Sequence, residues 1–388
     1  MLLSLSLIFI IGLLFAAILK KIKFPSIIGF LICGIILGPY MLNLIDASLL
    51  NISSELRQIA LIIILLRAGL MLNLNDLKKI GRPAFLLCFI PAFFELIAIA
   101  LIAPLLFDIS YLEALLLGSV VAAVSPAIIV PRMIKMIENN QGTKKGVPQL
   151  IMAGASVDDV LVIVLFTVFL TLSQGGSLSL GTVISIPASI IFGVGVGVVC
   201  ALLLIIIFKR YHIRDSIKVI IILSVCFALV SLEKLLSIPF SGLIATIVIG
   251  MVILYKYEIL AQRLSNKYSK LWIVAEILLF VLVGASVDIS FFIQNILFSI
   301  LIISCGLIVR MLGVWVSLIK TKFTPHEKLF CSIAYTPKAT VQAAIGSVPL
   351  ALGLSSGNII LSVAVVAILL TAPIGAFLID NLRTKLIS

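Results

Sequence analysis

Long apolar runs separated by short polar loops make up most of the chain. A helix needs about 20 apolar residues to cross the hydrocarbon core of a bilayer, and the runs reach or approach this length without the alternation typical of membrane β-strands. The pattern therefore predicts an all-α polytopic membrane protein with about thirteen transmembrane helices. We expect these at Leu2–Leu19, Pro25–Leu44, Gln58–Leu74, Ala84–Phe107, Tyr111–Ile137, Val147–Leu172, Leu178–Phe208, Ser216–Leu235, Pro239–Tyr255, Leu271–Ile289, Ile296–Ile319, Leu329–Leu352 and Ile359–Ile379.

Basic residues gather in every second loop between these runs. The loops after the first, third, fifth, seventh, ninth and eleventh runs, with the C-terminal tail, hold most of the 28 lysines and arginines. The alternate loops hold only Arg57 and Lys234. Because cytoplasmic loops carry the excess of positive charge, we expect a multi-pass protein of the cell (inner) membrane, with its N-terminus outside and its C-terminus in the cytoplasm.

The composition excludes several classes of protein. Apolar residues make up 62% of the chain, charged residues only 11%, and the mean hydropathy is +1.34, values that no soluble domain of this length matches. The net charge of +12 lies mainly in the predicted cytoplasmic loops. It therefore indicates orientation and contact with anionic lipids rather than nucleic-acid binding. All six cysteines fall within apolar runs, so we expect no disulfide framework, no cysteine metal site and no cofactor.

The predicted loops are too short to hold a soluble domain. We therefore expect no nucleotide-binding domain, which excludes an ATP-driven pump with its own motor and most membrane enzymes. A membrane enzyme would also need a nucleophile–base pair or a metal site, and both histidines, His212 and His326, lie in loops. The chain is not expected to be an enzyme.

Seven ionisable residues lie within the predicted spans. A charge at the bilayer centre costs a few kcal/mol or more, so such residues pair with one another, face a cavity or serve the function. Seven of them in one bundle indicate an ion or proton path. They are Arg67, Glu95, Asp158, Asp159, Glu276, Arg310 and Lys338.

Two of these residues, Asp158 and Asp159, are neighbours near the middle of the sixth run. Adjacent positions on a helix point about 100° apart, so one carboxylate can take a counter-charge from the protein while the other meets water and a cation. A partly desolvated carboxylate can exchange a proton for a metal cation. The alternative is a fully paired structural dyad, which would need two cationic partners.

The fifth and twelfth runs each carry a proline at mid-depth, in Val124-Ser125-Pro126-Ala127 and in Thr336-Pro337-Lys338-Ala339-Thr340. A broken helix is tolerated in lipid only where it lines a cavity or packs in protein, and its freed carbonyls can bind a small cation. Lys338 could neutralise the negative ends of two facing half-helices.

The two halves of the chain also repeat each other with opposite orientation. The second and ninth runs open similarly, with Phe24-Pro25-Ser26 and Pro239-Phe240-Ser241. The order of these similarities, with one break in each half, predicts an inverted repeat of five helices, an arrangement typical of transporters.

These residues resemble the monovalent cation/proton antiporters of the sodium/proton exchanger superfamily. The similarity covers nearly the whole chain and rests on the paired aspartates in Gly154–Asp159, on the two breaks, and on the run Pro337–Ala344. Together with Arg67–Leu70, that last run is most similar to the NHA-like branch with paired Asp. The resemblance implies a homodimer and a fold with two crossed broken helices. It implies a core ion-transport side at about 84–172 and 296–380, a dimerisation and scaffold side at about 1–75 and 214–292, and a linker helix at 178–208.

The resemblance also implies roles for single residues. Asp159 would bind Na⁺ and carry the proton, and Asp158 belongs to the pattern of the branches with paired Asp. Where the best-known electrogenic bacterial members have a lysine before the second break, this chain has Arg310, which cannot release a proton during the cycle. Glu95 would be its partner in a structural charge pair.

The sequence therefore predicts a secondary active transporter that exchanges Na⁺ or Li⁺ for H⁺ by alternating access. Cation and proton would compete for Asp159, with oxygen ligands near Asp158, Ser125, Ser156 and Thr340. One alternative is K⁺/H⁺ exchange. Another is a Na⁺-coupled symporter for an organic anion, which would need a roomier polar cavity than the few intramembrane amides and arginines provide.

Overall fold

The computed structural model describes residues 1–22, 24–71, 81–174, 180–235 and 240–387. Every regular element in these ranges is a helix. Contacts divide the chain into two compact units. Unit 1 comprises Met1–Ser54, Asp76–Gln174 and Ile277–Ser388, and unit 2 comprises Glu55–Asn75 and Gly175–Glu276.

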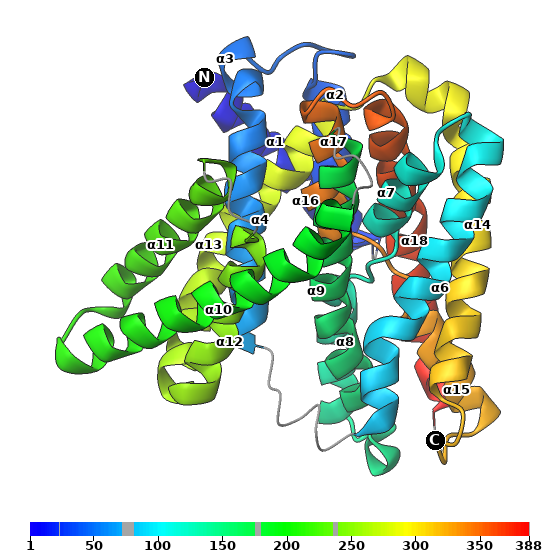
Figure 1. Cartoon of the computed structure of the whole chain (residues 1–388). Coiled ribbons are helices and arrows are strands. Elements are labelled where there is room, and N and C mark those ends of the chain that lie inside the picture. Colours follow the sequence, from blue (N-terminus) through cyan, green and yellow to red (C-terminus); the bar gives the residue numbers. More distant parts are fainter. Residues whose placement is uncertain (23, 72–80, 175–179, 236–239, 388) are drawn as a thin grey trace. The chain divides into compact units, whose positions relative to one another are not determined.

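Unit 1 holds both termini and both broken helices. Figure 1 shows the N-terminus and the C-terminus at opposite ends of this unit. Which end faces the cytoplasm stays a prediction. Its elements are α1 (Leu2–Lys21), α2 (Ser26–Leu37), α3 (Ala47–Asn51), α6 (Arg82–Phe107), α7 (Tyr111–Val121), α8 (Pro126–Glu138), η1 (Thr143–Lys145), α9 (Val147–Ser173), the end of α13 (Glu258–Ala285), α14 (Ile289–Ser317), α15 (Pro325–Ala334), α16 (Thr340–Gly346), α17 (Val348–Ala351) and α18 (Gly357–Leu386).

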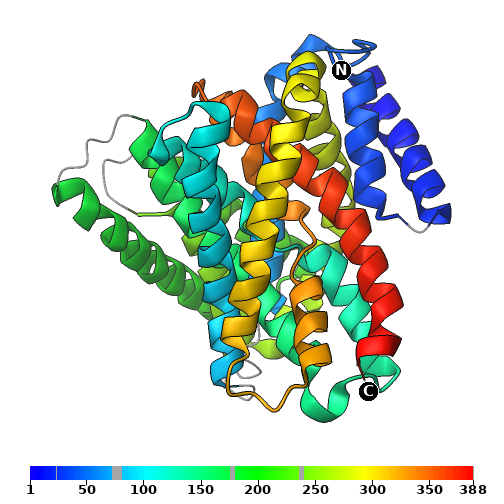
Figure 2. The same ribbon diagram turned by 90° about the vertical axis from the view of Figure 1, so that its right-hand side faces the viewer.

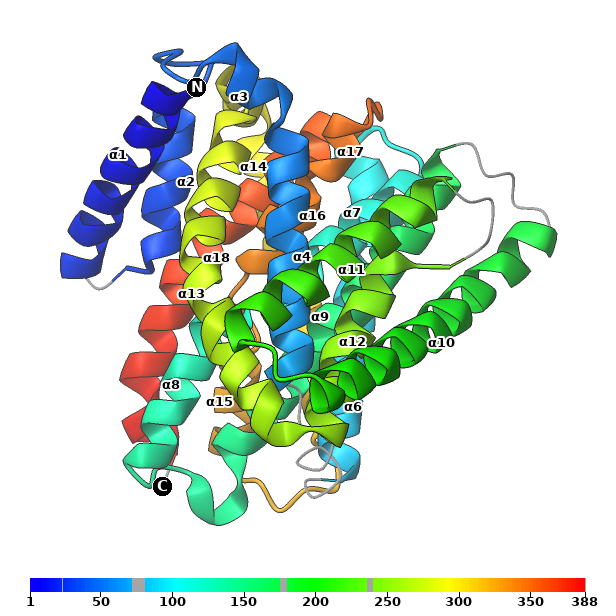
Figure 3. The same cartoon turned by 90° about the vertical axis from the view of Figure 1, so that its left-hand side faces the viewer.

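Unit 2 is built around close contacts between helices at small residues. It holds most of α4 (Ser53–Met71) and α13, with α10 (Leu180–Arg210), α11 (Asp215–Leu235) and α12 (Gly242–Lys256), as Figure 3 shows. A Cβ atom at Gly250 would lie 2.8 Å from the Leu66 carbonyl oxygen of α4, and one at Gly197 would lie 2.8 Å from the Ala245 oxygen. Glycine at these positions lets the backbones approach, as in other membrane helix pairs.

In unit 1 the helices α6 and α14 lie side by side (Figures 1 and 2), and glycines again set their approach. A Cβ atom at Gly313 would lie 2.9 Å from the Cα atom of Pro91, and one at Gly306 would lie 3.4 Å from Cγ of Glu95. Arg310 lies between these glycines on α14, so this close contact brings its side chain to the height of Glu95 on α6.

The expected helix breaks are present in unit 1. Helix α7 ends at Val121 and α8 begins at Pro126, so residues 122–125 form the first break. Helix α15 ends at Ala334 and α16 begins at Thr340, so residues 335–339 form the second break. The two breaks touch, because the backbone N–H of Ser125 donates to the Pro337 carbonyl over 2.8 Å. This is the crossed arrangement that the resemblance implies.

Both broken helices open with a capping box, in which a hydroxyl and a glutamate cap each other's backbone N–H groups. The pairs are Ser110 with Glu113 at α7 and Thr324 with Glu327 at α15. Each glutamate also binds the connection that follows the other broken helix: Glu113 accepts from Ser355 over 2.7 Å, and Glu327 accepts from Lys145 over 2.9 Å.

The capping glutamates thus repeat the inverted symmetry of the fold. Burial opposes ionisation of Glu327, but hydrogen bonds from Lys145 and from the Thr324 backbone outweigh it and hold its pKa below the ordinary value.

The predicted spans and the observed helices differ where a run contains a break or a loop, and also at α13, which begins at Glu258 and not at the predicted Leu271. Eight helices among the described residues are long and apolar enough to cross a membrane, and shorter apolar helices add to them. The second run was expected to reach Leu44, but α2 ends at Leu37 because the chain turns at Gly38. The number thirteen stays a prediction. The division into a core side and a dimerisation side also stays a prediction. The two compact units are defined by contacts within the chain, whereas the predicted sides are defined by their movement relative to each other.

Candidate functional site

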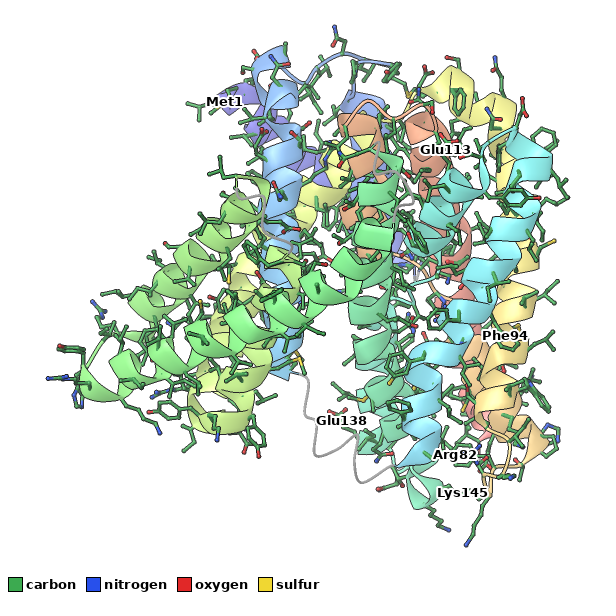
Figure 4. The ribbon with its side chains drawn as sticks, in the orientation of Figure 1. Met1, Arg82, Phe94, Glu113, Glu138 and Lys145 are labelled. Carbon is green, nitrogen blue, oxygen red and sulfur yellow. The ribbon has the colours of Figure 1, made fainter. Side chains whose placement is uncertain are left out.

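The candidate site lies halfway along the long axis of unit 1. Figure 4 shows Phe94, the neighbour of Glu95, midway along α6. Arg82 lies at one end of this helix, and Glu113 lies beyond the other end at the start of α7. The site is therefore at the depth where charged side chains are most costly.

Arg310 is the centre of the site. Its side chain is fully buried, and its guanidinium donates to Glu95 over 2.8 Å and to Asp158 over 2.8 Å. It also donates to the Tyr335 carbonyl over 2.8 Å and to the Ala122 carbonyl. One side chain thus binds two carboxylates and one carbonyl from each break. The five N–H groups of arginine in a planar fork make this possible.

Lys338 also binds Glu95. Its ammonium nitrogen lies 2.6 Å from Oε2 of that carboxylate, and both side chains are fully buried. Its backbone N–H, in the second break, donates to the Thr371 hydroxyl of α18 over 2.8 Å. The ammonium group of Lys338 therefore pairs with the carboxylate of Glu95. These contacts do not test the prediction that Lys338 neutralises the negative ends of the half-helices.

Asp158 is held by two donors. Its Oδ2 atom accepts from Arg310 and from the backbone N–H of Val124 in the first break, the latter over 2.9 Å. Glu95, Asp158, Arg310 and Lys338 therefore form a buried cluster of two negative and two positive charges, which we call the charge cluster.

Asp159 stands apart from the charge cluster. Only 7% of it is exposed, and its Oδ1 atom is buried without a hydrogen-bond partner. Within the described part of the chain, no ion pair joins it to a basic residue. The charges of the cluster cancel, so Asp159 leaves one buried negative charge in excess. Such a group must bind a proton or another cation.

Two of the predicted ligand hydroxyls are also buried without partners, namely Oγ of Ser125 in the first break and Oγ1 of Thr340 at the start of α16. No hydrogen bond joins either of them to Asp159 in the described residues. The side chain of Ser156 lies outside what the structure describes. Carboxylate and hydroxyl oxygens are the ligands that hard cations prefer.

Sequence reasoning missed three residues of this site. Tyr335 offers its carbonyl to Arg310 and holds its ring 5.6 Å from the guanidinium. Thr371 binds Lys338. Gln342 binds the carbonyls of Val120 and Val121 in α7 and that of Ala123 in the first break. Gln342 lies within the run Pro337–Ala344, where a buried amide at membrane depth is itself a signal of function. The capping boxes could have been found from their spacing alone.

Comparisons with known proteins agree with this geometry. The family model described as "Sodium/hydrogen exchanger, transmembrane" matches residues 5–382. Sodium/hydrogen exchanger 9B1 of Homo sapiens is 33% identical over 356 residues, which cover 87% of this chain and 67% of that protein. Sodium/hydrogen exchanger 9B2 of Mus musculus is 32% identical over 380 residues, covering 94% and 68%.

A solved structure shows the same fold. The sodium proton antiporter MjNhaP1 from Methanocaldococcus jannaschii superposes with a TM-score of 0.83 at 23% identity, covering 98% of this chain and 97% of that one. The fold is thus that of a sodium/proton antiporter, and the relatives are exchangers rather than enzymes. On the match of its family model and the identity of its relatives, the chain belongs to the sodium/hydrogen exchanger family.

Proposed function

We propose that this protein exchanges Na⁺ or Li⁺ for H⁺ and that the two ligands compete for Asp159. The observation that carries the proposal is that Asp159, beside the balanced charge cluster, has no ion-pair partner among the described residues. A carboxylate in this setting is occupied by one cation at a time, so binding of Na⁺ releases the proton and binding of the proton releases Na⁺. This competition couples the two fluxes, provided that the empty site does not cross.

Alternating access would expose this site to one side of the membrane at a time. The two crossed breaks support this, because carbonyls and hydroxyls at mid-depth can replace part of the hydration shell of a small cation. The loaded site carries no excess charge in either form, with Asp159 protonated or with Na⁺ bound, so both forms can cross. The empty site, with Asp159 ionised, would carry a buried negative charge, so its crossing is disfavoured.

An organic anion would need a free cationic group for recognition. In the charge cluster Arg310 and Lys338 are both bound to carboxylates, so neither is available to an incoming anion. Together with the family, this favours exchange over anion symport. We further propose a homodimer in the cell membrane, with contacts to anionic lipids at its basic cytoplasmic loops.

Proteoliposomes with an acidic lumen test the exchange. We expect Na⁺ or Li⁺ added outside to dissipate the pH gradient at a rate that saturates with cation, whereas K⁺ and choline leave the gradient intact. Dissipation by K⁺ alone would show a K⁺/H⁺ exchanger. An intact gradient with all three alkali cations, under conditions where the protein takes up Na⁺ only with an organic anion, would show a symporter.

The charge cluster also predicts the stoichiometry. Two protons per cation would require a second group that titrates in each cycle. Asp158 is bound by Arg310 and by the Val124 N–H, and Glu95 and Lys338 are bound to each other. Arginine stays protonated at accessible pH. We therefore expect electroneutral exchange of one proton for one cation, with an initial rate that a valinomycin-imposed potential leaves unchanged. Acceleration at one polarity and slowing at the other would show that Asp158 titrates.

A further inference from the structure

Gln342 makes an unusual set of contacts at the end of the first half-helix. Its side chain lies in α16 and is fully buried. The amide nitrogen Nε2 lies 3.2 Å from the Val120 oxygen, 3.2 Å from the Val121 oxygen and 2.8 Å from the Ala123 oxygen. One side chain from the second broken helix thus faces three carbonyls of the first, with that of Ala122 skipped.

These carbonyls need an outside donor, because Val120 and Val121 end α7 and Ala123 follows in the first break. The last four carbonyls of a helix have no partner within the helix, and this end lies at membrane depth, where water does not supply one. Arg310 binds the carbonyl of Ala122, and Gln342 binds the carbonyls on either side of it. The end of α7 is thereby capped by one charged and one neutral side chain.

The orientation of the Gln342 amide follows from the same contacts. All three facing groups are acceptors, so only the NH₂ end of the amide can face them. The Oε1 atom then points away, and it is buried without a hydrogen-bond partner in the described residues. A carboxylate at this position would repel the carbonyls, and an aliphatic side chain would remove their shared donor.

The last of these carbonyls, that of Ala123, already lies in the first break. The next backbone group after Ala123, the N–H of Val124, donates to Asp158, and the N–H of Ser125 donates to the Pro337 carbonyl. We propose that Gln342 is a positioning residue for the exchange reaction, holding the end of α7 so that the first break binds Asp158 and presents the Ser125 hydroxyl. This inference rests on cation/proton exchange at the site but not on which cation is carried.

Variants at Gln342 test the inference in the liposome exchange assay. Gln342→Leu removes the donor and is expected to lower the maximal exchange rate at least tenfold. Gln342→Asn keeps the donor on a shorter side chain and should retain an intermediate rate. Val341→Ala on the same helix is the matched control, since the Val341 side chain is buried but has no hydrogen-bond donor. This variant should lose about as much thermal stability as Gln342→Leu but keep most of the wild-type exchange rate.

Gln342→Glu separates positioning from simple packing. A protonated carboxyl can still donate one hydrogen bond, whereas an ionised one donates none, so its rate relative to Gln342→Leu should fall as the pH rises. The ratio of the wild-type exchange rate to that of Val341→Ala should not change with pH. The inference is wrong if Gln342→Leu retains more than half of the wild-type rate. It is also wrong if Gln342→Leu loses no more exchange rate than Val341→Ala does for the same loss of thermal stability.

Direct binding of the cation by Oε1 would give a different result. In that case Gln342→Glu would lower the cation concentration for half-maximal rate and keep the maximal rate, which would overturn the positioning role. Where Gln342→Leu does not fold, the Asn and Glu variants decide the question. A wild-type protein without any cation-dependent flux would count against the proposed function, whereas an active wild type with an equally active Gln342→Leu counts only against this inference.

Discussion

Replacing Asp159 with Asn is expected to abolish cation-dependent proton flux while the protein still folds. The substitution removes the titratable group and the negative charge but keeps the shape of the side chain. The buried Oδ1 atom of Asp159 has no partner to lose, and an uncompensated buried charge disfavours the folded state. We therefore expect thermal stability at neutral pH to be equal to that of the wild type or higher. Flux is measured in proteoliposomes and stability by thermal unfolding in detergent.

Asp158→Asn is the informative control for this variant, because it changes the adjacent residue in the same way. Asp158 binds Arg310 over 2.8 Å, so its loss removes a counter-charge from the charge cluster. We expect it to lower stability and to retain part of the exchange, the opposite of Asp159→Asn on both measures. Clear Na⁺-dependent proton flux through Asp159→Asn would remove Asp159 from the site.

The sequence predicts the breaks and the depth of the charges well, for a physical reason. Pro126 and Pro337 each remove a backbone donor inside an apolar run, and a helix in lipid has no water to satisfy the carbonyl that loses its partner. Likewise Glu95 and Arg310 are each too costly alone at that depth, so their contact follows once both are placed within spans.

What the sequence does not provide is the rotation of each helix and the reach of each side chain. Whether Asp158 is free or paired depends on which way α9 turns relative to α14, and hydropathy says nothing about this because the helices are apolar nearly all round. The structure shows Asp158 paired through Arg310. That Arg310 also binds one carbonyl in each break depends on the exact paths of residues 122–125 and 335–339, which no periodicity encodes.

Removing Arg310 is expected to have the largest effect on stability. Arg310→Ala leaves Glu95 and Asp158 without this partner and leaves the carbonyls of Ala122 and Tyr335 unpaired. Breaking a buried ion pair usually costs about 3–5 kcal/mol, because a charge is stranded, so we expect a loss of at least this size. Arg310→Lys should be intermediate, since one ammonium cannot reproduce the planar fork.

A second substitution should recover part of this loss, and the two carboxylates should differ in how much. Without Arg310, Glu95 still has the ammonium of Lys338 at 2.6 Å, whereas Asp158 keeps only the backbone N–H of Val124. The stranded charge is therefore mainly that of Asp158. We expect Asp158→Asn to restore more stability to Arg310→Ala than Glu95→Gln does, because it leaves the Lys338–Glu95 pair intact and the remaining charges balanced.

Double-mutant cycles measured by thermal unfolding give the two coupling energies. Exchange should stay low in both double variants, since the Tyr335 and Ala122 carbonyls remain uncapped. Additive losses in both cycles would show that Arg310 is not coupled to either carboxylate. A larger recovery with Glu95→Gln than with Asp158→Asn would show that Lys338, and not Arg310, is the cation on which the charge of Asp158 depends.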